Sequence, residues 1–286
     1  MHRIGDLRNT IGVGNTVLGP DPVLVGVLNV TPDSFSDGGD FSDPERAVAR
    51  AATMLDEGAH VIDVGGESTR PGSDPVSPDE EWRRVVPVIQ GIVADRPEAI
   101  VSIDTYRAEI AGAALEAGAR VINDVTALRG DPRMADVVAG ARCPVILMHM
   151  LGEPKTMQRE PRYDDVVREV RDFLAKRVEH AAAAGVQEEN IILDPGIGFG
   201  KTLEHNLVLL RHLDSLVELG FPVLVGASRK SFIGRLTGVE EARDRIPGTV
   251  AANVIACELG ATFFRVHDVR ANREALAVAW AILNAG

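Results

Sequence analysis

Hydrophobic and polar positions repeat along this chain in a single unit from about residue 23 to the end. In each unit an amphipathic, alanine-rich helical stretch ends near a glycine, an apolar run follows, and polar residues come directly after it. Gly58, Gly118 and Gly260 stand where a helix is expected to end in a left-handed residue. The pattern predicts a regular alternation of helices and strands.

The apolar runs are eight in number, and each is long enough for one strand. They are continuous rather than alternating, which is typical of strands covered on both faces, and the helices between them require parallel pairing. No change in composition divides the repeats, so they predict a single α/β domain, a (β/α)₈ TIM barrel over residues 23–286, rather than two doubly wound domains. The runs lie at 23–28, 60–64, 99–103, 120–125, 144–148, 191–193, 222–226 and 262–266.

Residues 1–22 precede the repeats and differ from them in composition. Four glycines stand among short apolar pieces, at positions 5, 12, 14 and 19. This mixture predicts a short N-terminal extension that folds as a small hairpin before the barrel begins.

The bulk composition excludes several classes of protein. Of the 286 residues, 45% are hydrophobic and 25% are charged, which excludes a disordered chain. The formal net charge of −12 argues against a nucleic-acid or anionic-membrane partner. No apolar run approaches the roughly 18 residues of a membrane span, and the first ten residues lack a signal-peptide core, so we expect a cytoplasmic protein. Cys143 and Cys257 lack metal-ligand spacing and are interpreted as small buried hydrophobic residues.

A polar residue follows almost every predicted strand. A single such residue is usually only a cap for the next helix, but a set of eight converging on one rim of a barrel indicates a functional site, because barrels carry function at the carboxyl ends of their strands. The residues are Asn29, Asp63 with Glu67, Asp104, Asn123 with Asp124, His149, Asp194, Ser228 to Lys230, and Arg265 to Asp268.

The first of these polar ends opens the segment 29–39. Pro32 fixes its own φ and disfavours helix at the residue before it, while the glycines at 38 and 39 free the backbone, so the segment is interpreted as a mobile lid. The amide oxygen of Asn29 suits a hard metal ion. An ordinary turn with a capping Asn is the alternative, and spacing alone leaves it open.

A glycine-rich stretch at 196–202 looks like a nucleotide-binding loop but fails on spacing. Only three residues separate Gly196 from Gly200, where the phosphate loop needs four, and Lys201 occupies the sixth position of the dinucleotide fingerprint. We interpret the glycines as a tight turn that allows close approach and directs Asp194 into the barrel mouth.

An acidic protein that binds an anion must gather cations locally, and the rim offers such a group. Phosphate often binds after strands seven and eight of a barrel, so a phosphorylated substrate is expected. For Arg70, Arg229 and Lys230 a solvated surface charge is the alternative. The candidate cations are Arg70, Arg229, Lys230, Arg265 and His267.

Three acidic or amide residues at the rim suggest recognition of a planar heterocycle. Asp104, Asn123 and Asp194 can accept and donate hydrogen bonds along an edge that bears amidine-type N–H groups, because a carboxylate pairs with such a fork through both oxygens. Two further candidates have weaker support. His149 is left unassigned, and the pair Asp63 and Glu67 favours structural hydrogen bonding over metal binding, because no His or Cys accompanies it.

Several segments resemble those of the dihydropteroate synthase family. The match runs in order from about Val23 to the end and leaves out only residues 1–22. The matching segments are 29–39 (NVTPDSFSDGG), 62–72 (IDVGGESTRPG), 102–105 (SIDT), 122–124 (IND), 194–201 (DPGIGFGK), 226–232 (GASRKSF) and 265–269 (RVHDV).

The resemblance implies a (β/α)₈ barrel that joins 6-hydroxymethyl-7,8-dihydropterin diphosphate to 4-aminobenzoate and releases diphosphate. It implies small-molecule substrates, Mg²⁺ as cofactor and a homodimer joined through barrel helices. It also assigns roles to individual residues. The pterin would be held by Asp104, Asn123, Asp194 and Lys230, the diphosphate by Arg70, Arg265 and His267 with Asn29 and Mg²⁺, and the aminobenzoate by Thr69, Pro71, Phe199 and Ser228 with Lys230, under a lid of Pro32, Asp33 and Phe35.

Two other functions remain as alternatives. A pterin-dependent methyltransferase barrel would share the pterin edge but would need no diphosphate site, so Arg70, Arg265 and His267 speak against it. A non-catalytic homologue would bind pterin without turnover, and the sequence argues against it only weakly. For the enzyme we expect a dissociative substitution.

Overall fold

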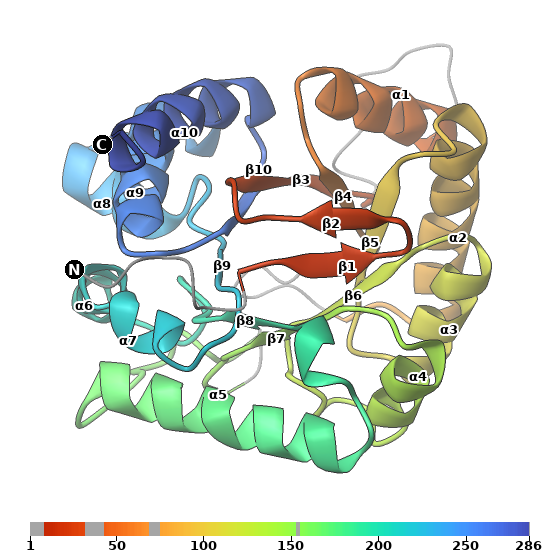
Figure 1. Ribbon diagram of the computed structural model, residues 1–286, viewed down its shortest axis with the longest axis horizontal. Coiled ribbons are helices and arrows are strands. Elements are labelled where there is room, and N and C mark those ends of the chain that lie inside the picture. The colour runs from red at the N-terminus through yellow and green to blue at the C-terminus, as the bar shows by residue number, and fades with distance from the viewer. Residues whose placement is uncertain (1–8, 32–42, 69–74, 153–154, 286) are drawn as a thin grey trace.

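The computed structural model describes residues 9–31, 43–68, 75–152 and 155–285. Eight parallel strands form an inner wall in the order β8-β7-β6-β5-β4-β3-β10-β9, and helices surround it (Figure 1). An isolated parallel bridge between Leu193 and Val223 joins β8 to β9 and closes the barrel. The strands are β3 (Val23–Asn29), β4 (Val61–Gly65), β5 (Ile100–Asp104), β6 (Val121–Asp124), β7 (Val145–Met148), β8 (Ile191–Asp194), β9 (Leu224–Val225) and β10 (Phe263–Val266). Each of the eight predicted runs overlaps one of these strands, so the predicted barrel is confirmed.

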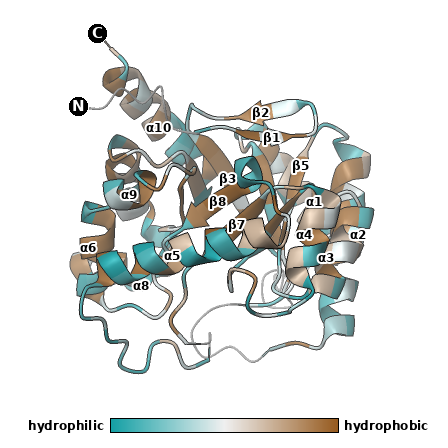
Figure 2. Cartoon of the chain, turned by 60° about the horizontal axis from the view of Figure 1, so that its bottom comes forward, coloured by the Kyte–Doolittle hydropathy of each residue, from teal (hydrophilic) through white to brown (hydrophobic). Residues whose placement is uncertain are grey.

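The helices pack their apolar sides on this wall and turn polar sides outward, as the hydropathy colouring of Figure 2 shows. Gly58, Gly118 and Gly260 have φ of 101°, 113° and 97°, which confirms the predicted left-handed helix ends. The helices are α1 (Asp43–Asp56), α2 (Pro78–Asp95), α3 (Ala108–Glu116), α4 (Met134–Ala141), α5 (Val166–Ala183), α6 (Leu203–Arg211), α7 (Asp214–Val217), α8 (Ser231–Thr237), α9 (Ile246–Glu258) and α10 (Val269–Leu283).

A two-stranded hairpin, β1 (Ile11–Val13) and β2 (Thr16–Leu18), lies across the amino end of the barrel (Figure 1). Its inward side chains join the lowest inward residues of the barrel strands in one apolar cluster, which we call the amino-end plug. Burial of each large side chain there stabilises the fold by about 1.5–3 kcal/mol. The predicted hairpin is therefore present, and it seals one end of the barrel. The plug comprises Ile11, Val13, Leu18, Val23, Val25, Val61, Ile100, Val121, Ile146, Ile192, Leu224 and Phe263.

Strand register places the polar strand ends at one level of the opposite rim. Asn29 pairs with Gly65, Gly65 with Asp104, and Asp104 with Asn123. Two residues earlier along β4, Asp63 lies opposite Ser102 and is completely buried. In parallel strands such residues point into the barrel together, so the register itself assembles a site. None of the helices in the described ranges is long and apolar enough to cross a membrane.

Candidate active site

Asp63 is the buried centre of the polar group at the barrel mouth. Its Oδ2 accepts hydrogen bonds from Asn123 Nδ2 at 3.0 Å and from Arg265 Nε at 2.6 Å. Asn123 itself is 3% exposed. The interpretation of Asp63 as a structural hydrogen-bonding residue fits this geometry, because it orients two neighbours that lie closer to the open rim.

Arg265 bridges two carboxylates. Besides the bond to Asp63, its Nη2 donates to Asp104 Oδ2 at 2.7 Å, and its side chain is only 20% exposed. Burial opposes the charge of this guanidinium, but Asp63 and Asp104 outweigh burial and raise its pKa. Arg265 therefore stays cationic and ties the carboxyl ends of β4 and β5 to β10. Its predicted contact with diphosphate is untested.

Two carboxyl groups have pKa values shifted toward neutrality. Burial raises the pKa of Asp104 to about 7, with Arg265 opposing the rise and Asp63 adding to it. Burial also raises the pKa of Asp194 to about 6, although the Gly196 N–H, which donates to Oδ1 at 2.6 Å, favours the ionised form. Perturbed carboxyl groups that converge in a barrel mouth are a common sign of a functional site.

The loop after β8 makes the close approach that its glycines predicted. A Cβ on Gly196, whose φ is 67°, would lie 1.9 Å from the carbonyl oxygen of His149, so only glycine fits there. The turn carries Phe199, whose ring lies 4.0 Å beneath the ammonium nitrogen of Lys230. The structure thus brings together Asp194, Phe199 and Lys230, three of the predicted site residues.

Ser228 and His267 join the loops after β9 and β10. Ser228 Oγ lies 2.9 Å from His267 Nδ1 and accepts a hydrogen bond from the His267 backbone at 3.1 Å. The Arg229 guanidinium donates two hydrogen bonds to Asp268, at 2.9 and 2.6 Å. This bidentate pair holds the Arg229 guanidinium against Asp268, and its place among the anion-binding cations stays a prediction.

Six predicted site residues lie outside the described residues: Pro32, Asp33, Phe35, Thr69, Arg70 and Pro71. Asn29 is described, and its Oδ1 and the Asp104 Oδ2 lie 3.9 and 3.8 Å from the point where a Gly65 Cβ would stand. These are hard oxygen donors beside an open backbone. Within the described ranges no cluster of three or more His, Cys, Asp or Glu residues has metal-ligand geometry. Because Asp104 Oδ2 already accepts from Arg265, the Asn29 amide oxygen remains as a donor here, and one protein oxygen fits Mg²⁺ held mainly by substrate phosphates.

Glu67 belongs to an ion cluster beside the rim. Its carboxylate lies 2.9 Å from Arg107 Nη1, accepts from Tyr106 Oη at 3.1 Å, and accepts from the Val76 N–H at 3.3 Å. Arg107 also pairs with the buried Glu81. The sequence interpretation of Glu67 as a structural residue fits these contacts, which fix the backbone at residues 67 and 76.

Sequence reasoning missed a buried pair behind the loop after β8. Lys201 Nζ lies 2.9 Å from His149 Nδ1 and donates to the Phe199 carbonyl oxygen at 3.0 Å. Burial lowers the pKa of Lys201 to about 7, and burial together with Lys201 lowers the pKa of His149 to about 2. One signal for this pair was present in the sequence, because Lys201 lies inside the glycine-rich stretch 196–202.

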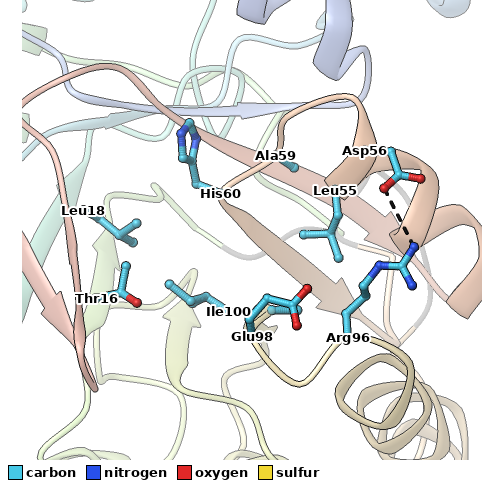
Figure 3. A pocket seen from close by; sticks show the side chains of 10 residues that line it. Thr16, Leu18, Leu55, Asp56, Ala59, His60, Arg96, Glu98 and Ile100 are labelled. Carbon is cyan, nitrogen blue, oxygen red and sulfur yellow. Dashed lines mark ion pairs between the residues drawn. The ribbon is translucent and has the colours of Figure 1, made fainter.

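A separate cavity of about 330 Å³ lies at the opposite end of the barrel, beside the hairpin (Figure 3). Leu18, Leu55 and Ile100 line it together with the ion pair of Asp56 and Arg96. None of the predicted site residues lines it. This cavity is therefore separate from the predicted site at the carboxyl ends of the strands.

Comparison with known proteins agrees with this geometry. The model of the pterin binding enzyme family matches residues 25–267. The dihydropteroate synthase of Synechocystis is 47% identical over 272 residues, covering 94% of both chains. The chain belongs to the dihydropteroate synthase family.

Solved structures of dihydropteroate synthases share the whole barrel. The Xanthomonas albilineans enzyme with 4-aminobenzoic acid has a TM-score of 0.91 and 47% identity, covering 97% of this chain and 99% of that one. The same enzyme in complex with 7,8-dihydropteroate has a TM-score of 0.88 and 44% identity, covering 97% of this chain and 100% of that chain. Family membership therefore extends over the entire fold.

Proposed function

We propose that this chain joins 6-hydroxymethyl-7,8-dihydropterin diphosphate to 4-aminobenzoate, forming 7,8-dihydropteroate and releasing diphosphate. The observation that carries the proposal is the convergence of Asp104, Asn123 and Asp194 on one rim, next to Phe199 and Lys230. Relatives of the same fold hold 4-aminobenzoic acid and 7,8-dihydropteroate. The chemistry of those two molecules matches the acceptors and the aromatic and cationic groups at this rim.

The carboxyl groups would recognise the pterin by its N–H edge. Asp194 is largely ionised at pH 7.5 because its pKa is about 6. Its Oδ1 already accepts from Gly196, but a carboxylate has about four acceptor positions and can still take two N–H groups of a planar ring. Asn123 is oriented by Asp63, so its amide is fixed before the ligand arrives.

The test of this function is one assay. The purified chain is incubated with the pterin diphosphate, 4-aminobenzoate and Mg²⁺, and dihydropteroate and diphosphate are measured. Equal amounts of both products are expected. Pterin binding without products would favour a non-catalytic homologue, and methyl transfer from a methylated pterin would favour the methyltransferase alternative.

We propose that the carbon–oxygen bond to diphosphate largely breaks before the arylamine attacks. The ring can delocalise positive charge from the exocyclic carbon, and Asp104 and Asp194 would stabilise that charge. The amine of 4-aminobenzoate is neutral at pH 7, so it needs no base before attack. Its nitrogen then forms the new bond to the exocyclic carbon and loses a proton.

Positional isotope exchange tests this order of events. The bridging diphosphate oxygen is labelled, and benzoate fills the aminobenzoate pocket without offering an amine. Scrambling of the label is expected, because cleavage is reversible without a nucleophile. A ternary complex that forms but shows no scrambling would favour concerted displacement.

We propose that Asn29 faces Mg²⁺ bound through the diphosphate. When bound, the ion would neutralise part of the charge on the leaving group. Removal of Mg²⁺ by a chelator should therefore weaken binding of the pterin diphosphate by about tenfold or more and leave binding of the bare pterin unchanged. Calorimetric titration of both ligands measures the difference, and equal effects on the two would contradict this role.

We also propose a homodimer that pairs through α8, α9 and α10. Helix α9 contacts both α8 and α10, and all three helices expose large apolar side chains. The exposed residues are Leu236 at 56%, Ile255 at 50%, Val278 at 61%, Ile282 at 69% and Leu283 at 40%. An apolar patch of this kind commonly marks a protein interface. Sedimentation velocity should give a dimer for the wild type and a monomer for Ile255→Glu.

A cytoplasmic location is the last part of the proposal. Cys143 and Cys257 are both free and buried, which fits a reducing compartment. Fractionation of cells that express the chain should place the activity with cytoplasmic markers.

A further inference from the structure

Two buried ionisable residues at the site have no role in the reaction described above. His149 follows β7 and is 5% exposed, and Lys201 ends the loop after β8 and is 3% exposed. Burial of an amine is costly unless its hydrogen bonds are made. Their joint burial directly behind predicted substrate contacts therefore calls for an explanation.

The hydrogen bonds of Lys201 have a defined direction. The Phe199 carbonyl oxygen can only accept, so Lys201 donates to it. The second contact of Lys201, to His149 Nδ1, is equally short. His149 is a neutral imidazole at pH 7, and an ammonium on Lys201 requires the ring to carry its proton on Nε2 and accept through Nδ1.

The His149 ring is itself held in place. Its centroid lies 4.8 Å from that of Phe173 in an edge contact, and its backbone N–H donates to the Asp194 carbonyl oxygen at 2.9 Å. His149 thus gives Lys201 a fixed partner on the barrel wall. Lys201 transmits that fixed position to the backbone of the turn.

The residue whose carbonyl oxygen Lys201 binds, Phe199, is also a predicted substrate contact. The Phe199 ring lies beneath the Lys230 ammonium, and a Cβ on Gly198 would lie 3.0 Å from Lys230 Cδ. The position of the turn therefore affects the positions of both the Phe199 ring and the Lys230 side chain. A shift of the Phe199 backbone would move the Phe199 ring and change its contact with the Lys230 ammonium.

We propose that Lys201, supported by His149, is a positioning residue for 4-aminobenzoate: it fixes the Phe199 backbone and thereby the ring and the Lys230 ammonium. This rests on the proposed function, because that function assigns Phe199 and Lys230 to the aminobenzoate pocket. Asp104 and Asn123, two of the predicted pterin contacts, make their hydrogen bonds without Lys201, whereas Phe199 is assigned to 4-aminobenzoate alone. Loss of Lys201 should therefore weaken binding of 4-aminobenzoate more than binding of the pterin.

The experiment compares Lys201→Met with a matched control on the same turn. Gln158 Nε2 donates to the neighbouring carbonyl oxygen, that of Gly198, at 2.6 Å from the exposed side. Gln158→Met therefore removes one hydrogen bond from the turn without touching Lys201. Assays run at pH 8, where Asp194 is ionised with or without the neighbouring lysine.

For Lys201→Met we expect the KM for 4-aminobenzoate to rise about tenfold, the order of loss expected when a buried acceptor, here the Phe199 carbonyl oxygen, loses its donor. The Kd of bare pterin should rise by less than about threefold, because only Asp194 and Lys230 among its predicted contacts lie beside the turn. Gln158→Met should change both quantities by less than about twofold. Lys201→Arg, which keeps an N–H donor at this position, should recover part of the KM.

Three results would overturn the proposal. One is an unchanged KM for 4-aminobenzoate in folded Lys201→Met. Another is an equal loss of pterin affinity, which would indicate a general structural role, and the third is an equal KM rise in Gln158→Met. If Lys201→Met does not fold, His149→Gln serves instead, since it keeps Lys201 and replaces the ring acceptor. A threefold or greater rise in its KM for 4-aminobenzoate would support the pair, and no rise would overturn it.

Failure of the proposed function gives a different result. If the wild type forms no dihydropteroate, calorimetry with 4-aminobenzoate in the presence of pterin and diphosphate still compares wild type and Lys201→Met. Weaker binding of 4-aminobenzoate by Lys201→Met would then support the positioning role of Lys201 in a protein that does not catalyse the reaction. Equal binding overturns it.

Discussion

The two ends of the barrel are built from the same strands but have opposite interiors. At the amino end, apolar side chains such as Phe263 and Ile11 pack against one another. At the carboxyl end, the buried groups are charged, with Arg265 held between Asp63 and Asp104. Burial of charge costs free energy even when the charges are paired, whereas apolar burial contributes stability directly. The plug stabilises the fold, and the mouth uses part of that stability to hold polar groups in place.

Buried polar atoms at the boundary between the two ends lower the stability of the fold. Among the described residues and atoms, Asp63 Oδ1 and Ser102 Oγ are buried without a hydrogen-bond partner. A buried polar group without a partner typically costs about 1–3 kcal/mol. Both atoms lie one layer beneath the rim. A fold selected for stability alone would place apolar side chains there.

The largest expected effect comes from a large cavity in the plug. Phe263→Ala should lower the free energy of unfolding by about 3–5 kcal/mol, because Phe263 is 1% exposed and its neighbours cannot fill the space. Denaturant unfolding followed by circular dichroism measures the loss. Pterin affinity per folded molecule should stay unchanged at low temperature, and a parallel loss of affinity would contradict the separation of the two ends.

The converse change is at the mouth. Asp194→Asn should retain the fold and weaken pterin binding by about 2–5 kcal/mol, because an amide offers one acceptor and turns a donor toward the N–H pair. Calorimetry gives the affinity, and thermal unfolding gives the stability. Unchanged affinity in a folded variant would remove Asp194 from the pterin site.

A change in pH should act on the mouth alone. The ionised form of Asp194 binds the pterin, and its pKa is about 6, so binding is full above pH 7 and falls as pH drops through 6. At pH 5 the affinity should be about tenfold lower, since the ionised fraction falls tenfold per unit below the pKa. Calorimetric titrations from pH 5 to 8 measure the curve. A midpoint near 7 that persists in Lys201→Met would instead assign the control to Asp104.

The smallest expected effect is on the outer face of the hairpin. Val17 is 67% exposed, so Val17→Thr should change the free energy of unfolding by less than about 0.5 kcal/mol. Denaturant unfolding beside Phe263→Ala provides the scale. A loss above about 1 kcal/mol would show that the hairpin stabilises the barrel through more than its inward residues.

Most of the barrel was predictable from the sequence, because each strand lies in a mainly apolar run and several helices, such as α1, α3 and α9, end near a glycine. The rim residues were also predictable, since Asn29, Asp104 and Asn123 come directly at strand ends. Their shared level was not, because strand register depends on packing across the whole barrel. The resemblance to a family supplied the substrates, which no local pattern gives.

Other contacts depended on partners far apart in the sequence. The pairing of Arg229 with Asp268 spans 39 residues, and that of Lys201 with His149 spans 52. Neither pairing leaves a periodic signal, so the sequence did not predict Asp268 as the partner of Arg229 and gave Lys201 no role. The sequence shows which residues are charged, but it does not show which distant residue each of them pairs with.

The closure of the barrel has a consequence for local opening. β9 has two residues and β8 reaches it through a single bridge, where the Leu193 N–H donates to the Pro222 carbonyl oxygen at 2.9 Å. Separating β8 from β9 breaks fewer hydrogen bonds than separating the strands of any longer ladder in the barrel. In hydrogen exchange, we expect the Leu193 amide to exchange sooner than those of Ile62 and Val101. Asp194 is the next residue, so the catalytic rim borders the least protected line of the sheet.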